Sequence, residues 1–156
     1  MKLLNPSPGF VIDRLTILDL KIAAADKRQI NKSSFQAEKA TLEEYLRSWE
    51  ASLIDERAYT GRLEWVKDQI AQKKTGLVAV NSLLWEAYDN IRELSDLEMS
   101  KLAHLAKRIA KLTDSRDQLI QNLNELYGAG KIVEKIFGVP IGRQTKQEES
   151  QLRLFA

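Results

Sequence analysis

The chain contains no cysteine among its 156 residues, and this absence excludes a whole class of chemistry. Disulfide bonds, thiolate nucleophiles and cysteine-based zinc sites are all ruled out. The single histidine, His104, cannot form a histidine-rich metal centre within one chain. The composition therefore predicts a protein without a resident metal ion or cofactor.

Proline and glycine are also scarce, with three prolines and seven glycines, so long stretches are free to be helical. No run approaches the roughly 18–20 apolar residues that span a bilayer. Pro6, Pro8 and the pair Asp13–Arg14 interrupt the N-terminal segment before a signal-type apolar run develops. These features predict a cytoplasmic protein of bacterial type with no membrane partner.

Charge of one sign does not dominate the chain either. Its 24 basic and 22 acidic residues give a net charge of +2, so no strong field attracts nucleic acid or an anionic membrane. Hydrophobic residues make up 44% of the chain, a balance typical of globular proteins. The length suits a single domain with a real core.

Apolar residues recur at helical spacing through most of the sequence. The first predicted helix covers residues 8–28, with Ser7 as its cap and Pro8 in its first turn. It is apolar on two opposite sides, which places it in the middle of a bundle. A second helix follows the capping-box pattern Ser33-x-x-Gln36.

A third helix is predicted from about Arg62 to Leu94, with a possible kink or break near Gly76. A fourth follows a second capping-box pattern, Ser95-x-x-Glu98. Its apolar seam advances in alternating steps of three and four residues, as in a coiled coil. The seam positions are Leu102, Leu105, Ile109, Leu112, Arg116, Leu119, Leu123 and Leu126.

The predicted fold class is all-α: a single-domain bundle of three to four long helices, with a short C-terminal helix and a tail. Gly128 and Gly130 end the fourth helix, and a short amphipathic segment follows over residues 131–137. We predict a bundle domain over residues 1–138 and a tail over residues 139–156.

Arg116 occupies a seam position where the other seven residues are leucine or isoleucine. A guanidinium keeps its charge, so burying it requires a carboxylate, a ligand anion or water. Two interpretations stay open. One is an inter-helix salt-bridge cluster that fixes the register of the bundle. The other is a pocket for an anionic ligand, with Arg14, Arg92 and Arg116 as donors.

The candidate ligand-binding residues are the polar and aromatic side chains that accompany these arginines on helix faces. Asp13 and Asp89 are predicted to share a buried polar cluster with Arg92 and Arg116. A magnesium site with Glu86 among its oxygen ligands is a weaker variant. The full candidate set is Asp13, Arg14, Asn81, Trp85, Asp89, Arg92, Asp114 and Arg116.

Three segments resemble uncharacterised bacterial all-helical domain families. They are PGFVIDRLTILDLKI, VNSLLWEAYDNIRELSD and LAKRIAKLTDSRDQLIQNLNELYG. The shared pattern is an IDRLTIL start, an N-x-x-L-W-x-x-x-D-x-I-R helix and a D-x-R-x-x-L helix, over roughly half the chain. Proteins of this kind resemble ones often encoded beside sugar-transferase genes, which implies a link to glycan metabolism but no particular activity.

The C-terminal segment Gln151-Leu152-Arg153-Leu154-Phe155 resembles the pentapeptide with which bacterial proteins bind the replication sliding clamp. In such a motif Gln151 forms a hydrogen bond, and Leu154 and Phe155 enter an apolar pocket. Arg153 departs from the pattern, which prefers a small or acidic residue there. The alternative is that Leu152, Leu154 and Phe155 pack on this protein's own bundle or on a sister chain.

Three functional hypotheses follow. The first is a non-enzymatic interaction or assembly module that associates through its long helices, with a homodimer as one form. The second is a small binding protein or enzyme for an anionic ligand, such as a phosphorylated sugar or a nucleotide. The third is an accessory protein tethered to a sliding clamp. The sequence contains no phosphate loop, nucleophile elbow or Ser/His/Asp arrangement, and whether the protein is an enzyme stays open.

Overall fold

The computed structural model describes residues 6–57, 61–95 and 97–129, and within them every secondary-structure element is a helix. Four helices follow one another: α1 (Pro8–Arg28), α2 (Ser33–Arg57), α3 (Leu63–Glu93) and α4 (Met99–Leu126). The all-α prediction is confirmed. The predicted C-terminal segment over 131–137 and the domain boundary at residue 138 lie outside the described residues.

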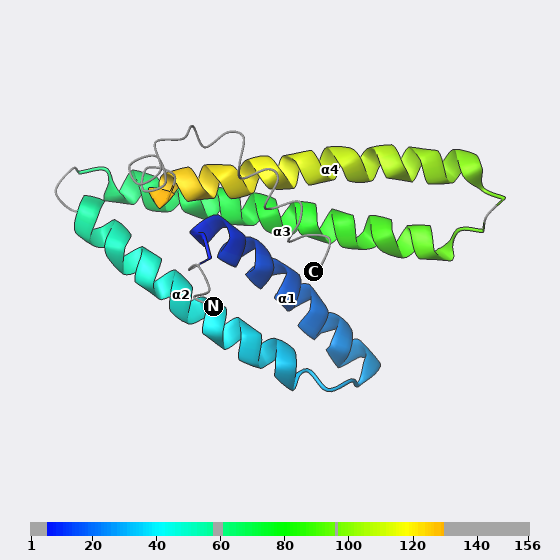
Figure 1. Ribbon diagram of the computed structural model, residues 1–156, viewed down its shortest axis with the longest axis horizontal. Helices are drawn as coiled ribbons and strands as arrows, with labels where there is room; N and C mark the ends of the chain where they lie inside the picture. Colours follow the sequence, from blue (N-terminus) through cyan, green and yellow to red (C-terminus); the bar gives the residue numbers. More distant parts are fainter. Residues whose placement is uncertain (1–5, 58–60, 96, 130–156) are drawn as a thin grey trace, which may run out of the picture.

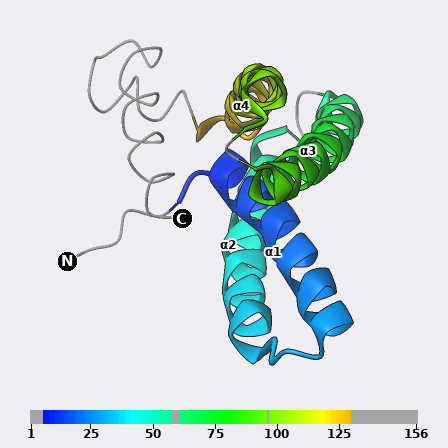
Figure 2. The same cartoon turned by 90° about the vertical axis from the view of Figure 1, so that its right-hand side faces the viewer.

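The helices form two hairpins of unequal reach. The helices α3 and α4 lie side by side along their whole length, whereas the α1–α2 hairpin covers one end of this pair and then diverges from it (Figures 1 and 2). Helix α1 packs against all three other helices, and α2 packs mainly against α1. The predicted central position of the first helix is therefore confirmed.

The start of α1 follows its sequence signals. The Ser7 hydroxyl accepts a hydrogen bond from the Phe10 amide at 3.3 Å, and Pro8 occupies the first helical position. Gln29 ends the helix in the left-handed region, with a φ of 53°. Both the cap and the bounds of this helix are predicted correctly.

Two predicted caps are wrong. Ser33 already belongs to α2, and its amide donates at 2.9 Å to the side chain of Asn31, which satisfies a free amide at the helix start. The last helix begins at Met99 instead of directly after Ser95. Only half of that capping box forms, because Glu98 accepts from the Ser95 amide at 3.3 Å.

Helix α3 runs unbroken through Gly76, so the predicted interruption is absent. The missing side chain instead allows a close approach of α4. A Cβ at this position would lie 3.3 Å from a methyl group of Leu119. Gly76 is therefore a packing residue at the contact between the two long helices.

The core lies where α1 and α2 cover the α3–α4 pair. Helix α4 contributes Ile120 and Leu123, which both follow Arg116 in the sequence, and its first half contributes no buried residue. The main hydrophobic cluster is thus confined to one end of the long pair, although Leu84 and Ala87 farther along α3 are also buried. Its buried members are Val11, Ile12, Leu18, Leu42, Leu46, Leu53, Val66, Ile70, Leu77, Ile120, Leu123 and Tyr127.

The start of α1 is anchored directly on α4. The Gly9 amide donates to the side-chain oxygen of Asn124 at 2.7 Å, so a residue of another helix satisfies one of the amides that α1 leaves free at its start. This contact brings the backbone of α1 against that of α4.

An ion pair joins α1 to α2 on the opposite side of α1. The Arg14 guanidinium donates to both carboxylate oxygens of Glu38, at 2.7 and 3.3 Å. These hydrogen bonds and the charge of Arg14 outweigh partial burial and lower the pKa of Glu38 below its ordinary value of 4.5.

This lowered pKa gives a pH prediction. A carboxyl whose pKa falls on folding stabilises the protein above its unfolded pKa, and this stability is lost as the pH falls through the lower, folded pKa. We expect carbon-detected NMR titration to show Glu38 ionising below pH 4.5. Arg14→Gln should return that pKa toward its ordinary value. The variant should lose at most about 1 kcal/mol at neutral pH, because the pair is partly exposed. An unchanged Glu38 titration in the variant would refute the assignment.

Candidate functional site

The polar residues predicted around Arg116 meet where α1 crosses α3 and α4. The carboxylate of Asp13, which is 4% exposed, accepts two hydrogen bonds from the Arg116 guanidinium. The Nε donates to Oδ1 at 2.7 Å and an Nη to Oδ2 at 2.5 Å. This paired geometry is the strongest form of an arginine–carboxylate contact.

Two further side chains complete this arrangement. The amide nitrogen of Asn81 donates to Asp13 Oδ1 at 3.0 Å and to the Thr16 hydroxyl at 2.5 Å. The Thr16 hydroxyl in turn donates to the backbone carbonyl of Asp13 at 2.7 Å. We call Asp13, Thr16, Asn81 and Arg116 the Asp13 cluster. It joins three helices through side chains alone.

The charge of Arg116 is matched within its surroundings. Burial alone would lower the pKa of this guanidinium, but the hydrogen bonds and charge of Asp13, helped by Asp117 and Tyr88, raise it above its ordinary value. The Arg116 side chain keeps only 18% of its exposure. Its positive charge is held by a neighbouring carboxylate and is only partly accessible to solvent.

The other predicted site residues lie elsewhere. Arg14 is bound to Glu38, and Asp114 is exposed. Asp89 and Arg92 pair with each other at 3.0 Å on the surface of α3, where the Arg92 side chain is 74% exposed. The prediction that Asp89 and Arg92 belong to the buried cluster is therefore wrong: the core ends before their turn of α3.

Thr16 and Glu38 take part in these contacts but were not among the predicted site residues. The signal for Thr16 was its position three residues after Asp13, on the same face of α1. Glu38 offered no comparable signal, because α2 places many charged residues at similar spacing. Its pairing depends on the angle at which α1 meets α2.

Among the described residues, no group of three or more acidic or histidine side chains gathers closely enough to hold a metal ion. His104 lies on the surface of α4. No helix in the described ranges is long and apolar enough to cross a membrane.

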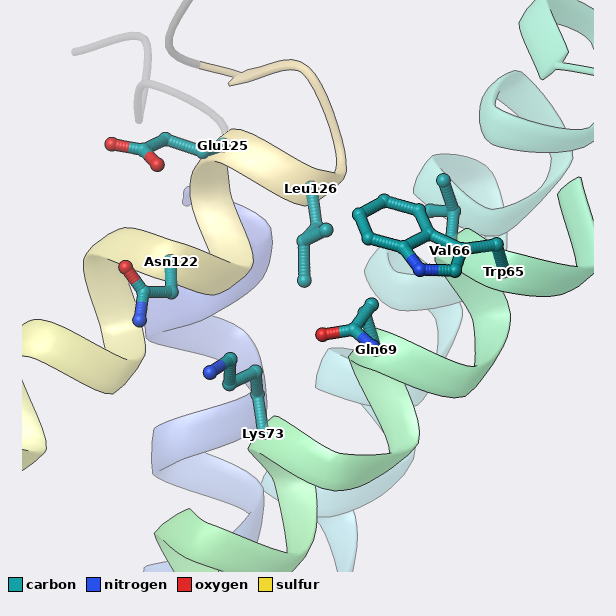
Figure 3. Close-up of a pocket in the computed structure, with 7 residues that line it drawn as sticks. All are labelled: Trp65, Val66, Gln69, Lys73, Asn122, Glu125 and Leu126. Atoms are coloured by element: carbon teal, nitrogen blue, oxygen red, sulfur yellow. The ribbon is translucent and has the colours of Figure 1, made fainter. Parts of the chain in front are cut away.

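Two depressions on the described surface lie away from the Asp13 cluster and include none of its members. One of about 280 Å³ lies between the start of α3 and the end of α4 (Figure 3). Its Lys73 and Glu125 have opposite charges, so it presents no concentrated charge of one sign. Its lining residues are Trp65, Val66, Gln69, Lys73, Asn122, Glu125 and Leu126. The other lies along the outer face of α2 over Ala40–Ser48.

Among the described residues, no helix covers the end of the α3–α4 pair from which the α1–α2 hairpin has diverged (Figure 1). We call Leu84–Glu93 of α3 and Met99–Thr113 of α4 the distal arm. Large apolar side chains remain exposed there: Tyr88 at 49%, Met99 at 67% and Leu102 at 38%. Two helices alone cannot bury the apolar seam that the sequence places along α4.

Comparisons with known proteins add no relative to this description. No family model matches the chain, and neither a curated protein nor a solved structure shows significant similarity to it. The resemblance to bacterial helical domains therefore stays a prediction. The clamp-like segment, Gln151, Leu152, Leu154 and Phe155, lies outside the described residues and also stays a prediction.

Proposed function

We propose that this protein is a non-enzymatic interaction module, in which the Asp13 cluster fixes the two hairpins to each other and the distal arm provides the contact surface. The observation that carries the proposal is that none of the described helices covers the distal arm, where Tyr88, Met99 and Leu102 are exposed. Exposed apolar side chains that gather on one part of a surface are typical of interaction sites.

The geometry of the Asp13 cluster favours a structural role for Arg116. An anion would have to displace Asp13 from the guanidinium, and the freed carboxylate would then be buried without its partner. That exchange is unfavourable, because an uncompensated buried charge costs several kcal/mol. The alternative function is a binding protein or enzyme for a phosphorylated sugar or nucleotide. To avoid displacing Asp13 from Arg116, such a protein would need a cationic site elsewhere.

The distal arm also adds no residue to the main hydrophobic cluster, although Leu84 and Ala87 within it are buried. The core residues of α4 all follow Arg116, and those of α3 in the main hydrophobic cluster end at Leu77. A long paired extension that adds little to the core yet exposes large apolar side chains is expensive to keep in solution. Contact with another protein accounts for its presence.

Thermal-shift measurements with anionic metabolites test this proposal against its alternative. We expect inorganic phosphate, sugar phosphates and nucleotides to change the melting temperature by less than about 1 °C beyond sodium chloride at equal ionic strength. A ligand at about 100 times its dissociation constant adds about 2.7 kcal/mol, a shift of several degrees. A shift of that size in the wild type that is lost in Arg116→Lys would overturn the proposal in favour of an anion site.

Arg92→Lys is the matched control for that screen. It makes the same substitution at an exposed arginine that the sequence had placed in the same candidate pocket. A shift that persists in Arg116→Lys but disappears in Arg92→Lys would locate an anion site on α3, and this too would contradict the proposal.

A further inference from the structure

One side of the distal arm continues the surface that α1 covers in the other half. On α4 this side is defined by Arg116 and Asn124, which contact α1. An α-helix turns by 100° per residue, so the residues of α4 that extend this side toward the connection between α3 and α4 can be read from the sequence. All of them are uncharged. They are Met99, Leu102, Ala106, Ile109 and Thr113. The basic residues and His104 of this segment project in other directions: Lys101, His104, Lys107, Arg108 and Lys111.

The matching side of α3 is defined by Asn81, which reaches Asp13 and Thr16 on α1. Continued toward the tip, it presents Trp85, Tyr88 and Arg92, with Asp89 at its outer edge. We call the combined surface, from Trp85 to Arg92 on α3 and from Met99 to Thr113 on α4, the open face. Its charged side chains are Asp89 and Arg92, of opposite sign and one turn apart.

We propose that the open face binds the open face of a second copy of this chain, so that two distal arms form an antiparallel four-helix bundle. This inference rests on the proposed function and names its partner. A twofold interface brings the same surface against itself, so it must be either uncharged or self-complementary in charge. The α4 part of the open face is uncharged. Its α3 part is self-complementary, because a twofold axis between Asp89 and Arg92 sets each arginine against the aspartate of the other copy.

The position of this axis can be followed onto α4. Asn81 and Arg116 both bind Asp13 and therefore lie at the same height on the antiparallel pair. On α3, the midpoint between Asp89 and Arg92 lies nine to ten residues beyond Asn81 toward the tip. Because α4 runs in the opposite direction, the same distance toward the tip from Arg116 leads back along the sequence to Ala106. Ala106 then meets Ala106 of the other copy, and its small side chain permits the close approach that helix packing at this point requires.

The antiparallel arrangement also leaves room for the α1–α2 hairpins. Each hairpin contacts one end of its own α3–α4 pair and then diverges from it (Figures 1 and 2). When the tips point in opposite directions, the two hairpins lie at opposite ends of the new bundle. With the tips aligned, each hairpin would occupy the space of the other copy's long helices.

The size of the open face sets the strength of the dimer. Fifteen residues of helix extend about 22 Å, and a pair of helices is about 20 Å wide, which gives an area of about 450 Å² per copy. The total of about 900 Å² belongs to the class of weak, transient interfaces. We therefore expect a dissociation constant of about 10 µM to 1 mM.

Sedimentation equilibrium of the full chain from about 10 µM to about 1 mM tests this proposal. We expect a monomer–dimer equilibrium in that range. Ala106→Glu should weaken it at least about 10-fold, because two like charges meet at the axis. Ala106 is exposed and not part of the core, so the variant should fold normally, as circular dichroism would verify. A monomer at every concentration, or a dimer unaffected by Ala106→Glu, would overturn the proposal.

Leu83→Glu is the matched control. Leu83 is 37% exposed, almost the same as Leu102 at 38%, but it projects from the other flank of α3. Leu102→Glu should weaken the dimer at least about 10-fold, and Leu83→Glu less than about 2-fold. Equal effects of the two variants would show that the open face is not the contact.

The absence of cysteine allows a geometric test, because a single introduced thiol has no competitor in the chain. A disulfide forms only when two Cα atoms come within about 7 Å. Under mild oxidation, Ala106→Cys should give a covalent dimer at least about 10 times faster than Leu83→Cys. Equal rates would overturn the twofold axis at Ala106. If the protein is a monomer and no anion changes its melting temperature, only the proposal of self-association is rejected. If an anion raises the melting temperature in a way that depends on Arg116, the proposed function is rejected.

Discussion

Arg116→Met is expected to lower the free energy of unfolding by about 3–5 kcal/mol, as measured by urea denaturation at neutral pH. The methionine removes the guanidinium and leaves Asp13, a 3% exposed residue, with Asn81 as its remaining side-chain donor among the contacts of the cluster. A buried carboxylate without a cation is among the most expensive defects in a folded protein. A loss below about 1 kcal/mol would contradict the role assigned to this pair.

The double variant Asp13→Leu/Arg116→Met separates the loss of the Arg116 side chain from the cost of a buried Asp13 carboxylate without its cation. Leucine has nearly the shape of aspartate, and an apolar pair that replaces a buried ion pair is often neutral or stabilising. Asn81 keeps its hydrogen bond to the Thr16 hydroxyl, so its amide is not left without a partner. We expect the double variant to regain most of the stability that Arg116→Met loses. A double variant no more stable than the single one would show that the carboxylate is not the cause.

Arg92→Met is the control for this pair of variants. It removes the same guanidinium from an ion pair with the same type of acid, but on the surface. Exposed pairs of this kind contribute about 0–1 kcal/mol. A large effect at Arg92 would mean that the loss at Arg116 reflects the loss of positive charge in general.

The sequence predicted the helices well because each signal was local. Ser7 and Pro8 set the start of α1, and apolar residues at helical spacing set the ends of α3 within a residue of those observed. The same local signals failed at Ser33 and Ser95, where the pattern of a capping box is present but the helix begins at Ser33 itself and at Met99. Competing caps a few residues apart differ by about 1 kcal/mol, so tertiary contacts decide between them.

The candidate site was predicted in part. Arg116 interrupted an apolar seam and Asp13 an apolar face, and both anomalies were visible without a structure. Asp89 and Arg92 were misplaced because a helical wheel treats α3 as if one core ran along its whole length. The main hydrophobic cluster in fact reaches only Leu77 on α3. Leu84 and Ala87 stay buried beyond it, but the face that carries Arg92 is exposed. The length of α3 that the α1–α2 hairpin covers depends on the angle at which the helices cross. The spacing of apolar residues in the sequence does not give that angle.

Gly9→Ala is expected to destabilise the protein by at least about 3 kcal/mol, because it forces apart the start of α1 and the end of α4. A Cβ at this position would lie 2.3 Å from the backbone oxygen of Ile120 and 2.7 Å from the side-chain oxygen of Asn124. Backbone atoms within a helix cannot yield as a side chain can. The helix must therefore shift, and the shift also weakens the hydrogen bond from the Gly9 amide to Asn124.

Gly76→Ala is the matched control, since it adds the same methyl group to the other glycine that lies at a helix contact. Here the nearest atom is a methyl group of Leu119 at 3.3 Å, the flexible end of a side chain. Alanine also favours a helix interior over glycine by about 1 kcal/mol, which offsets a small rearrangement. We expect Gly76→Ala to stay within about 1 kcal/mol of the wild type in the same urea titration. If both variants unfold at the same urea concentration, the close contact of α1 with α4 at Gly9 does not determine how the two hairpins are joined.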